Sequence, residues 1–243
     1  MKNQYFGDVN DYKKYGLLRL LNGCKQIRTA VCWMLTPNDL RTDGHRIDYL
    51  RQPEKWGSFD PIVYEFLRKQ VIECQIRNVN TLESSNVLPN CRFYSEVVQD
   101  NAGYRKEYLK RFLEFAHGST LVFFDPDNGM EVKSTRLGRK NSSKYLYWTE
   151  VEKSYSAGHS LLVYQHLPPK PREPFIRNLA DRFRAVTGVS CVYSYRTQFV
   201  VFFLIPQSIH RAVFALANRR VKEVWGKEIK VEKHELHFPS REN

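Results

Sequence analysis

Short apolar runs alternate with longer segments of helical periodicity along the chain. Runs of roughly four to eight apolar residues between turn residues are typical of strands, and apolar residues recurring every three or four positions are typical of helices. Strands are predicted at 29–35, 92–98, 121–124, 159–167, 191–195 and 198–206. Helices are predicted at 10–21, 61–71, 103–116, 145–155, 175–186 and 208–225. This alternation favours a mostly parallel sheet with helices on both faces.

The expected fold class is therefore α/β and Rossmann-like, with a C-terminal antiparallel strand pair formed by 191–195 and 198–206. The chain has 243 residues, of which 42% are apolar, enough to bury one large core. We predict a single α/β domain over 1–243. Within it, 36–60 and 133–145 are expected to be loop insertions near the site.

Charge and cysteine usage narrow the class of protein. Lys and Arg exceed Asp and Glu by 12, and the sequence pI is about 9.5, which favours a polyanionic partner, nucleic acid (RNA or DNA) ahead of an acidic membrane. Solvated lysines on a basic protein are the simpler interpretation of the same charge. The five cysteines are scattered without a C-x-x-C pair, which argues against a disulfide framework or zinc knuckle and fits a reducing cytoplasm. No apolar run approaches the roughly 20 residues of a membrane span. We expect a cytoplasmic protein with no membrane partner, and the sequence leaves its oligomeric state open.

Polar residues follow three predicted strands where each strand ends. Thr36-Pro-Asn-Asp follows the first strand, Asp125-Pro-Asp-Asn-Gly follows the middle one, and Gln165 and His166 end a later one. Ligands of open α/β sheets bind at the carboxyl ends of the strands. The sequence therefore predicts a site at this edge, with Gln165 and His166 in contact with substrate.

Two motifs carry a resemblance to a known family. The stretch Gly7-DVNDYKKYGLLRLL resembles an opening motif in which a Gly is followed by an Asp and then by a Lys-His pair on a helix. Leu121-VFFDPDNGME lies where the same family has an apolar strand and Asp-Pro-Pro-Tyr. The order of elements also matches, roughly from Gly7 to Trp225. The family is that of the bacterial adenine-N6 methyltransferases of large-subunit ribosomal RNA, the RlmJ-like family.

This resemblance implies a class I methyltransferase-like fold and S-adenosylmethionine-dependent methyl transfer to an adenine amine. It implies cofactor binding by Gly7, Asp11, Lys14 and Tyr15, where Tyr15 replaces the family's His, and it makes Asp125 the acceptor of the exocyclic amine. The chain departs from the family at two places. The turn 35–44 has its only glycine at Gly44, and Asp127 and Asn128 replace the second Pro and the aromatic residue. Base stacking would then fall to Tyr147 or Trp148.

The acids of the middle turn also support a second function. Asp125, Asp127 and Glu131 are close in sequence, and Asp39 or Asp43 would lie nearby at the same sheet edge. Clustered carboxylates bind Mg²⁺, which activates water against a phosphodiester. A metal-dependent nuclease or phosphohydrolase with these three acids as catalytic ligands is therefore the alternative to methyl transfer. A catalytically inactive module that only binds nucleic acid is a third hypothesis.

The segment 136–144 combines basic and small hydroxyl residues beside the expected site. Such a mixture suits phosphate contacts, so we assign substrate binding to Arg136, Arg139, Lys140 and Lys144. Simpler interpretations stand beside these assignments. The segment can be a solvated loop, Asp125 to Gly129 can be only a good turn, and Asp11 and Lys14 can be only an intrahelical ion pair.

Overall fold

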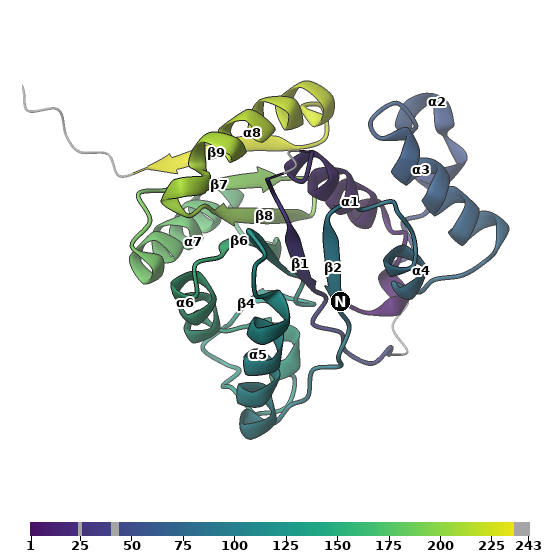
Figure 1. Ribbon diagram of the computed structural model, residues 1–243. Coiled ribbons are helices and arrows are strands. Elements are labelled where there is room, and N and C mark those ends of the chain that lie inside the picture. Colours follow the sequence, from purple (N-terminus) through teal and green to yellow (C-terminus); the bar gives the residue numbers. More distant parts are fainter. Residues whose placement is uncertain (24–25, 40–43, 236–243) are drawn as a thin grey trace, which may run out of the picture.

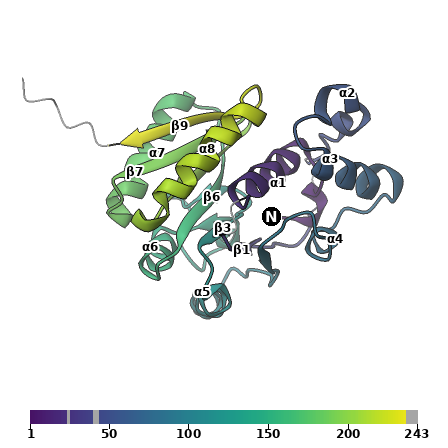
Figure 2. The same cartoon turned by 45° about the horizontal axis from the view of Figure 1, so that its top comes forward.

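The computed structural model describes residues 1–23, 26–39 and 44–235 and shows a sheet between two layers of helices (Figures 1 and 2). The seven-stranded sheet has the order β2-β1-β3-β6-β8-β7-β9. Its strands are β1 (Thr29–Cys32), β2 (Cys91–Tyr94), β3 (Leu121–Phe124), β6 (Ser160–His166), β7 (Cys191–Arg196), β8 (Val200–Ile205) and β9 (Lys230–Glu235).

The sheet is parallel in one half and antiparallel in the other. β2, β1, β3 and β6 pair in parallel, whereas β8 pairs antiparallel with both β6 and β7, and β9 pairs antiparallel with β7. The predicted fold class, an α/β Rossmann-like sheet with helices on both faces and an antiparallel C-terminal strand pair, is thereby confirmed. Strand β9 was not predicted, because its sequence Lys230-VEKHE is mostly charged and carries no apolar run.

Both faces of the sheet are buried because successive strand residues point to opposite sides. Val31 and Phe123 belong to a core with α1, α3 and α8, whereas Cys32 and Phe124 belong to a second core with α5, α6 and α7. The helices are α1 (Val9–Leu21), α2 (Pro53–Trp56), α3 (Pro61–Arg68), α4 (Asn80–Glu83), α5 (Ala102–Ala116), α6 (Trp148–Ser156), α7 (Arg172–Thr187) and α8 (Arg211–Trp225).

The predicted loop insertions contain some regular structure. The segment 36–60 includes a 3-10 turn at Asp48–Arg51 and helix α2. The helix predicted at 145–155 begins later than expected. Tyr145–Leu146 forms the short strand β5, which pairs with β4 (Gly129–Met130), before α6 begins. No helix within the described ranges has both the length and the apolar character that a membrane span requires.

Candidate functional site

A cavity of about 580 Å³ opens at the carboxyl edge of the parallel strands, beside the start of α1. It lies where β1 and β3 end, because Asp125 N–H bonds the Cys32 carbonyl and holds the two strand ends together. Acidic, basic and aromatic side chains all line it. They are Met1, Lys2, Tyr5, Asp8, Asn10, Asp11, Lys14, Gly44, His45, Arg46, Asp125, Pro126, Asp127, Asn128, Lys144, Tyr164, His166 and Phe199.

The start of α1 is built to point Asp11 into the site. Asp8 caps the helix by accepting from Asn10 N–H at 2.8 Å. Gly7 has φ +81°, and a Cβ there would lie 2.4 Å from Val71 Cγ2, so only glycine suits the turn. Gly7 N–H then donates to Asp11 Oδ2 at 3.1 Å. Gly7 therefore acts through Asp11 and has no side chain of its own to offer a ligand.

Lys14 joins the two predicted motifs. Its ammonium lies 2.7 Å from Asp11 Oδ1 and 2.7 Å from Asp125 Oδ2, and all three side chains are at most 5% exposed. Tyr15 donates its hydroxyl to Asp11 at 3.2 Å. The structure thus brings Asp11, Lys14 and Asp125 together, and we call these three residues the Lys14 cluster.

The Lys14 cluster holds one ammonium between two carboxylates, and this imbalance determines its protonation. Burial opposes the charge on Lys14, but the Asp11 and Asp125 carboxylates outweigh burial and raise its pKa. Burial raises the pKa of both Asp11 and Asp125, although Lys14 opposes that rise. Lys14 is therefore charged, and the pair of acids has a raised tendency to retain a proton.

Asp127 is part of a second polar group beside the first. Its Oδ1 lies 2.8 Å from the α-ammonium of Met1, and its Oδ2 accepts from Thr36 Oγ1 at 2.6 Å. The same α-ammonium donates to the Asp125 carbonyl at 2.8 Å and to the Met34 carbonyl at 3.3 Å. One carboxylate and two carbonyls at the ends of β1 and β3 therefore form an ammonium-binding site.

Gln165 holds the turn that carries these acids. Its Oε1 accepts from Met130 N–H at 2.8 Å, and its Nε2 donates to the Asn128 carbonyl at 3.2 Å. Gly129 has φ +107°, and a Cβ there would lie 2.3 Å from Gln165 Oε1. Gln165 is buried and does not line the cavity, so its position indicates support of the turn. The turn from Asp125 to Gly129, which the simpler interpretation of this segment predicted, is present. Its residues Asp125 to Asn128 also line the cavity.

His166 and Lys144 line the cavity on its more exposed side, with His45, Arg46 and Phe199. Burial and then the nearby Arg46 lower the pKa of His166, so its imidazole is neutral at pH 7. Tyr164 lies deeper, with Lys14 Nζ 5.9 Å from its ring centroid. Burial raises its pKa well above the usual value, and the surrounding carboxylates add to this effect.

Arg77 fixes the loop that brings His45 and Arg46 to the cavity. Its guanidinium donates to the Phe6 carbonyl at 2.8 Å and to the Gly44 carbonyl, and it lies 3.1 Å from His45 Nδ1. Sequence reasoning missed Arg77, because a lone Arg in a polar segment gives no signal of its partners. It also missed Arg46 and Tyr164, whose neighbours come from distant segments.

Several predicted residues lie away from the cavity. Glu131 Oε1 accepts from Trp148 N–H at 2.9 Å and so caps α6. Within the described part of the chain, no three His, Cys, Asp or Glu side chains are grouped to hold a metal ion. The set Asp125, Asp127 and Glu131 is therefore not assembled as a metal site, because Glu131 is used at the helix start. Asp43 lies outside the described residues.

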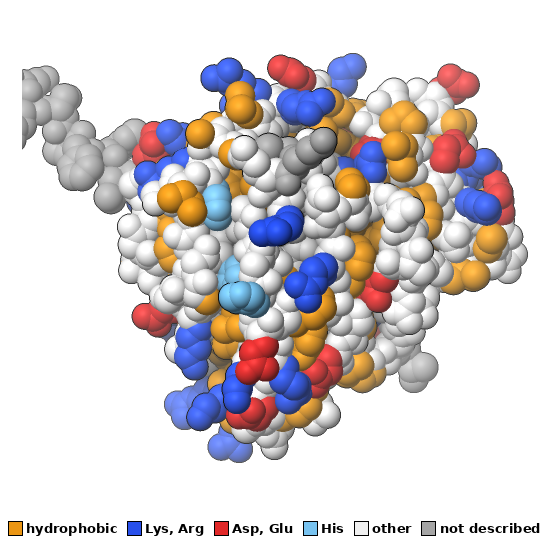
Figure 3. Space-filling view, viewed as in Figure 1, with side chains coloured by type: hydrophobic (Ala, Val, Ile, Leu, Met, Phe, Trp, Pro, Cys, Tyr) orange, Lys and Arg blue, Asp and Glu red, His pale blue; other side chains and the backbone are white. Residues whose placement is uncertain are grey.

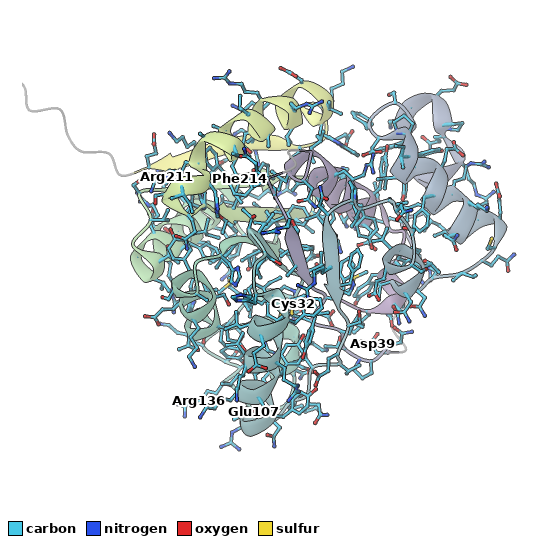
Figure 4. The ribbon with its side chains drawn as sticks, in the orientation of Figure 1. Cys32, Asp39, Glu107, Arg136, Arg211 and Phe214 are labelled. Carbon is cyan, nitrogen blue, oxygen red and sulfur yellow. The ribbon has the colours of Figure 1, made fainter. Side chains whose placement is uncertain are left out.

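The basic residues Arg136, Arg139 and Lys140 are exposed and do not line the cavity. Their loop is held by Asp100, which accepts from the Asn141 and Ser143 N–H groups, each at 2.7 Å. Lys and Arg side chains lie among Asp and Glu side chains around the lower end of α5 in the face that Figure 3 shows, and Figure 4 labels Arg136 and Glu107 there. These residues form a surface patch rather than part of the cavity.

Tyr147 and Trp148, expected to stack on a base, are 4% and 5% exposed. The Trp148 ring packs against Phe183, with centroids 4.8 Å apart. That expectation is wrong, because both residues are built into the start of α6 and the core beneath it. The aromatic side chains that line the cavity are Tyr5, Tyr164 and Phe199.

Comparisons with known proteins show structural likeness alone. No protein-family model matches the chain, and no curated protein matches its sequence. Among solved structures, it is similar to the crystal structure of protein LPL1258 from Legionella pneumophila str. Philadelphia 1, described as family-model DUF519. The TM-score is 0.43 at 11% identity, over 94% of this chain and 97% of that chain. The fold assignment rests on the strand order above and not on this match.

Proposed function

We propose that this protein is a nucleic-acid-modifying enzyme that transfers a methyl group from S-adenosylmethionine to the exocyclic amine of an adenine base. The observation that supports the proposal is the Lys14 cluster. It joins the opening motif of α1 to Asp125 in a cavity at the carboxyl ends of the strands, which is where such folds bind their ligands.

The residues present fit the amino-acid end of the cofactor. The cavity volume of about 580 Å³ is within the range of small-molecule sites. Asp127 with the Asp125 and Met34 carbonyls already holds an ammonium group, that of Met1. These acceptors would hold the cofactor's ammonium in place of Met1, and Lys14 would keep Asp125 in position beside them. Bound S-adenosylmethionine would supply an electrophilic methyl group on its sulfonium sulfur.

The turn after β1 contributes no glycine cradle. Leu35 pairs with Val97 instead, and Met34 takes a positive φ of 48° although it is not glycine. A close backbone approach to a cofactor normally needs glycine at such a turn. In this chain, cofactor binding therefore depends on side chains of α1 and of the turn after β3.

Asp125 is placed to orient the base amine. Lys14 bonds its Oδ2, and within the described residues no donor bonds its Oδ1. That oxygen can accept a hydrogen bond from an exocyclic amine and direct the nitrogen lone pair toward the methyl group. Tyr164 supplies an aromatic face on which the base can stack.

Calorimetric titration with S-adenosylmethionine, followed by transfer of a radiolabelled methyl group to single-stranded RNA and DNA, tests the proposal. The wild type should bind the cofactor saturably and label adenine. Asp125→Asn should lower transfer on the order of 100-fold with little change in cofactor binding. Asp181→Asn, an exposed residue of α7, is the matched control and should behave as wild type.

A wild-type protein that binds neither S-adenosylmethionine nor its demethylated product at about 1 mM, an affinity near 4 kcal/mol, would overturn the proposal. So would Asp125→Asn with full transfer activity.

A further inference from the structure

Two cations that line the cavity have no acidic partner among the residues that the structure describes. The lining acids are all engaged: Asp8 caps α1, Asp11 and Asp125 bond Lys14, and Asp127 bonds the Met1 ammonium. Arg46 and Lys144 also line the cavity, but neither forms an ion pair with any carboxylate in residues 1–23, 26–39 and 44–235. Among the described residues, positive charge is therefore left uncompensated on one side of the cavity.

Arg46 is held in place by contacts with two other segments. Its guanidinium carbon lies 3.5 Å from the centroid of the Phe199 ring, in the turn between β7 and β8. Its carbonyl accepts from Val9 N–H at 3.1 Å, and its own N–H donates to Asp8 Oδ2 at 3.3 Å. The backbone bonds fix the main chain of Arg46, and stacking holds its guanidinium over Phe199, where no group of the described residues hydrogen-bonds its edge.

Lys144 is tied to the turn after β3. Its carbonyl accepts from Asn128 N–H at 3.0 Å, next to Asp127. Arg46 is exposed and Lys144 is half-buried, whereas the Lys14 cluster is nearly inaccessible. The two unpaired cations therefore belong to the mouth of the cavity, and the carboxylates belong to its floor.

This division matches the chemistry of a nucleotide. Arg and Lys together bind phosphate strongly, Arg through its planar fork and Lys as a point charge. The neutral imidazole of His166 at the same mouth can add one hydrogen bond. A base has no net charge, and it suits the interior of the cavity, where Tyr164 offers an aromatic face and the Lys14 cluster offers hydrogen bonds.

We infer that Arg46 and Lys144 form a phosphate subsite at the mouth of the cavity, which holds the backbone phosphate of the nucleotide whose base lies inside. The substrate class is then a phosphate-bearing nucleotide unit of a single strand or of a flipped base. The inference rests on the proposed function for the identity of the base, but the phosphate subsite has a test of its own.

The test compares the affinities of adenosine monophosphate and adenosine for the full chain by calorimetry, without cofactor. The monophosphate should bind about tenfold more tightly than adenosine. Arg46→Gln and Lys144→Gln should each reduce this ratio by at least about threefold while leaving adenosine binding unchanged. Arg219→Gln and Lys222→Gln are matched controls, because both residues are exposed on α8 and neither lines the cavity. They should keep the wild-type ratio.

Binding to a single-stranded oligonucleotide gives a second readout. The slope of log affinity against log salt should fall by about 0.7 for each of Arg46→Gln and Lys144→Gln. Thermal unfolding by circular dichroism identifies any variant that fails to fold. If one does, Arg46→Lys or Lys144→Arg replaces it and should show a smaller reduction of the ratio.

Equal affinity for adenosine and its monophosphate, or no binding of either at about 10 mM, would overturn the inference. A third overturning result would be that Arg46→Gln weakens S-adenosylhomocysteine but not methylthioadenosine. The cations would then bind the cofactor's carboxylate. The proposed function fails separately, through absent S-adenosylmethionine binding, and that failure leaves the monophosphate ratio unaffected.

Discussion

Two buried ion clusters of similar burial lie on opposite faces of the sheet and differ in their charge balance. Arg105 of α5 and Glu150 of α6 form a two-point pair, with Arg105 Nε 2.6 Å from Oε1 and Nη2 2.9 Å from Oε2. The Lys14 cluster has two carboxylates for one ammonium. All of these side chains are at most 5% exposed.

The surroundings of the two clusters also differ. Arg105 donates to the Tyr145 carbonyl at 2.9 Å, and Glu150 accepts from Tyr147 N–H at 2.9 Å, so this pair fastens the start of α6. Neither residue lines the cavity, whereas all three members of the Lys14 cluster do. Burial and pairing are therefore common to both clusters, and only unequal charge beside a cavity distinguishes the proposed ligand site.

Removal of the cation from each cluster should give the largest and most informative difference. Arg105→Met leaves Glu150 buried and unpaired, and we expect it to lower the free energy of unfolding by about 3–5 kcal/mol. Lys14→Met should cost less, about 1–3 kcal/mol, because Asp11 and Asp125 already retain protons more readily and face a cavity. Urea denaturation monitored by circular dichroism measures both.

The two variants should also differ in ligand binding. Lys14→Met should lose S-adenosylmethionine binding, whereas Arg105→Met, at a temperature where it stays folded, should retain it. Equal losses of stability together with equal losses of binding would mean that the two clusters do not differ in role.

The sequence predicted the edge of the sheet at which these charges meet, because apolar strand runs end visibly in polar residues. It placed Asp125 at a strand end, and the resemblance brought Asp11 and Lys14 to the same site. Gln165 was expected to contact substrate, but its amide bonds the turn instead. That distinction depends on side-chain direction, which the strand pattern does not contain.

Other features depend on contacts between distant segments and have no local signature. Met1 reaches Asp127, Arg46 reaches Phe199, and Arg105 reaches Glu150 only after the sheet has formed. Glu131 looked like a metal ligand because it is close to Asp125 in sequence, but the chain turns at Gly129 and directs it to α6. Proximity in sequence was therefore a poor guide to proximity in the site.

A methyl group at Gly129, in the turn that lines the cavity, should lower the free energy of unfolding by an intermediate amount. Gly129→Ala places a Cβ 2.3 Å from Gln165 Oε1 in addition to the strain of φ +107°, and we expect a loss of about 2–3 kcal/mol. Gly118→Ala is the matched control, since its φ is +75° but nothing lies within 4 Å of the added Cβ. It should cost about 1 kcal/mol.

Cofactor affinity shows whether Gly129→Ala only strains the backbone or also displaces the turn. Gly129→Ala should weaken S-adenosylmethionine binding about tenfold, because Asp127 moves with the turn, and Gly118→Ala should not. A Gly129→Ala protein as stable as Gly118→Ala, with unchanged binding, would show that Gln165 does not hold the turn.

The smallest expected effect concerns pH and an acid outside the cavity. Glu96 follows β2 and accepts from the guanidinium of Arg111 and the hydroxyls of Tyr94 and Tyr104. The bond from Arg111 is the main cause that lowers the pKa of Glu96 from 4.5 to about 2, and the tyrosine hydroxyls add to it. Because the folded state favours the carboxylate, this contribution is present above pH 4.5 and is lost as the pH falls toward 2.

Asp11 and Asp125 act in the opposite direction. Their raised pKa values favour protonation in the folded state, so they give relative stability at low pH that is lost as the pH rises above 3.8. Glu96→Gln should therefore reduce the loss of melting temperature between pH 4.5 and 2, by on the order of 1–2 °C because Arg111 is largely exposed. Glu152→Gln, at an exposed residue of α6, should leave the loss unchanged. If Glu96→Gln loses as much melting temperature as the wild type, the acid sensitivity arises from other residues. The difference between Glu96, which has a cation of its own, and Asp11 and Asp125, which share one, would then have no effect on the pH dependence of stability.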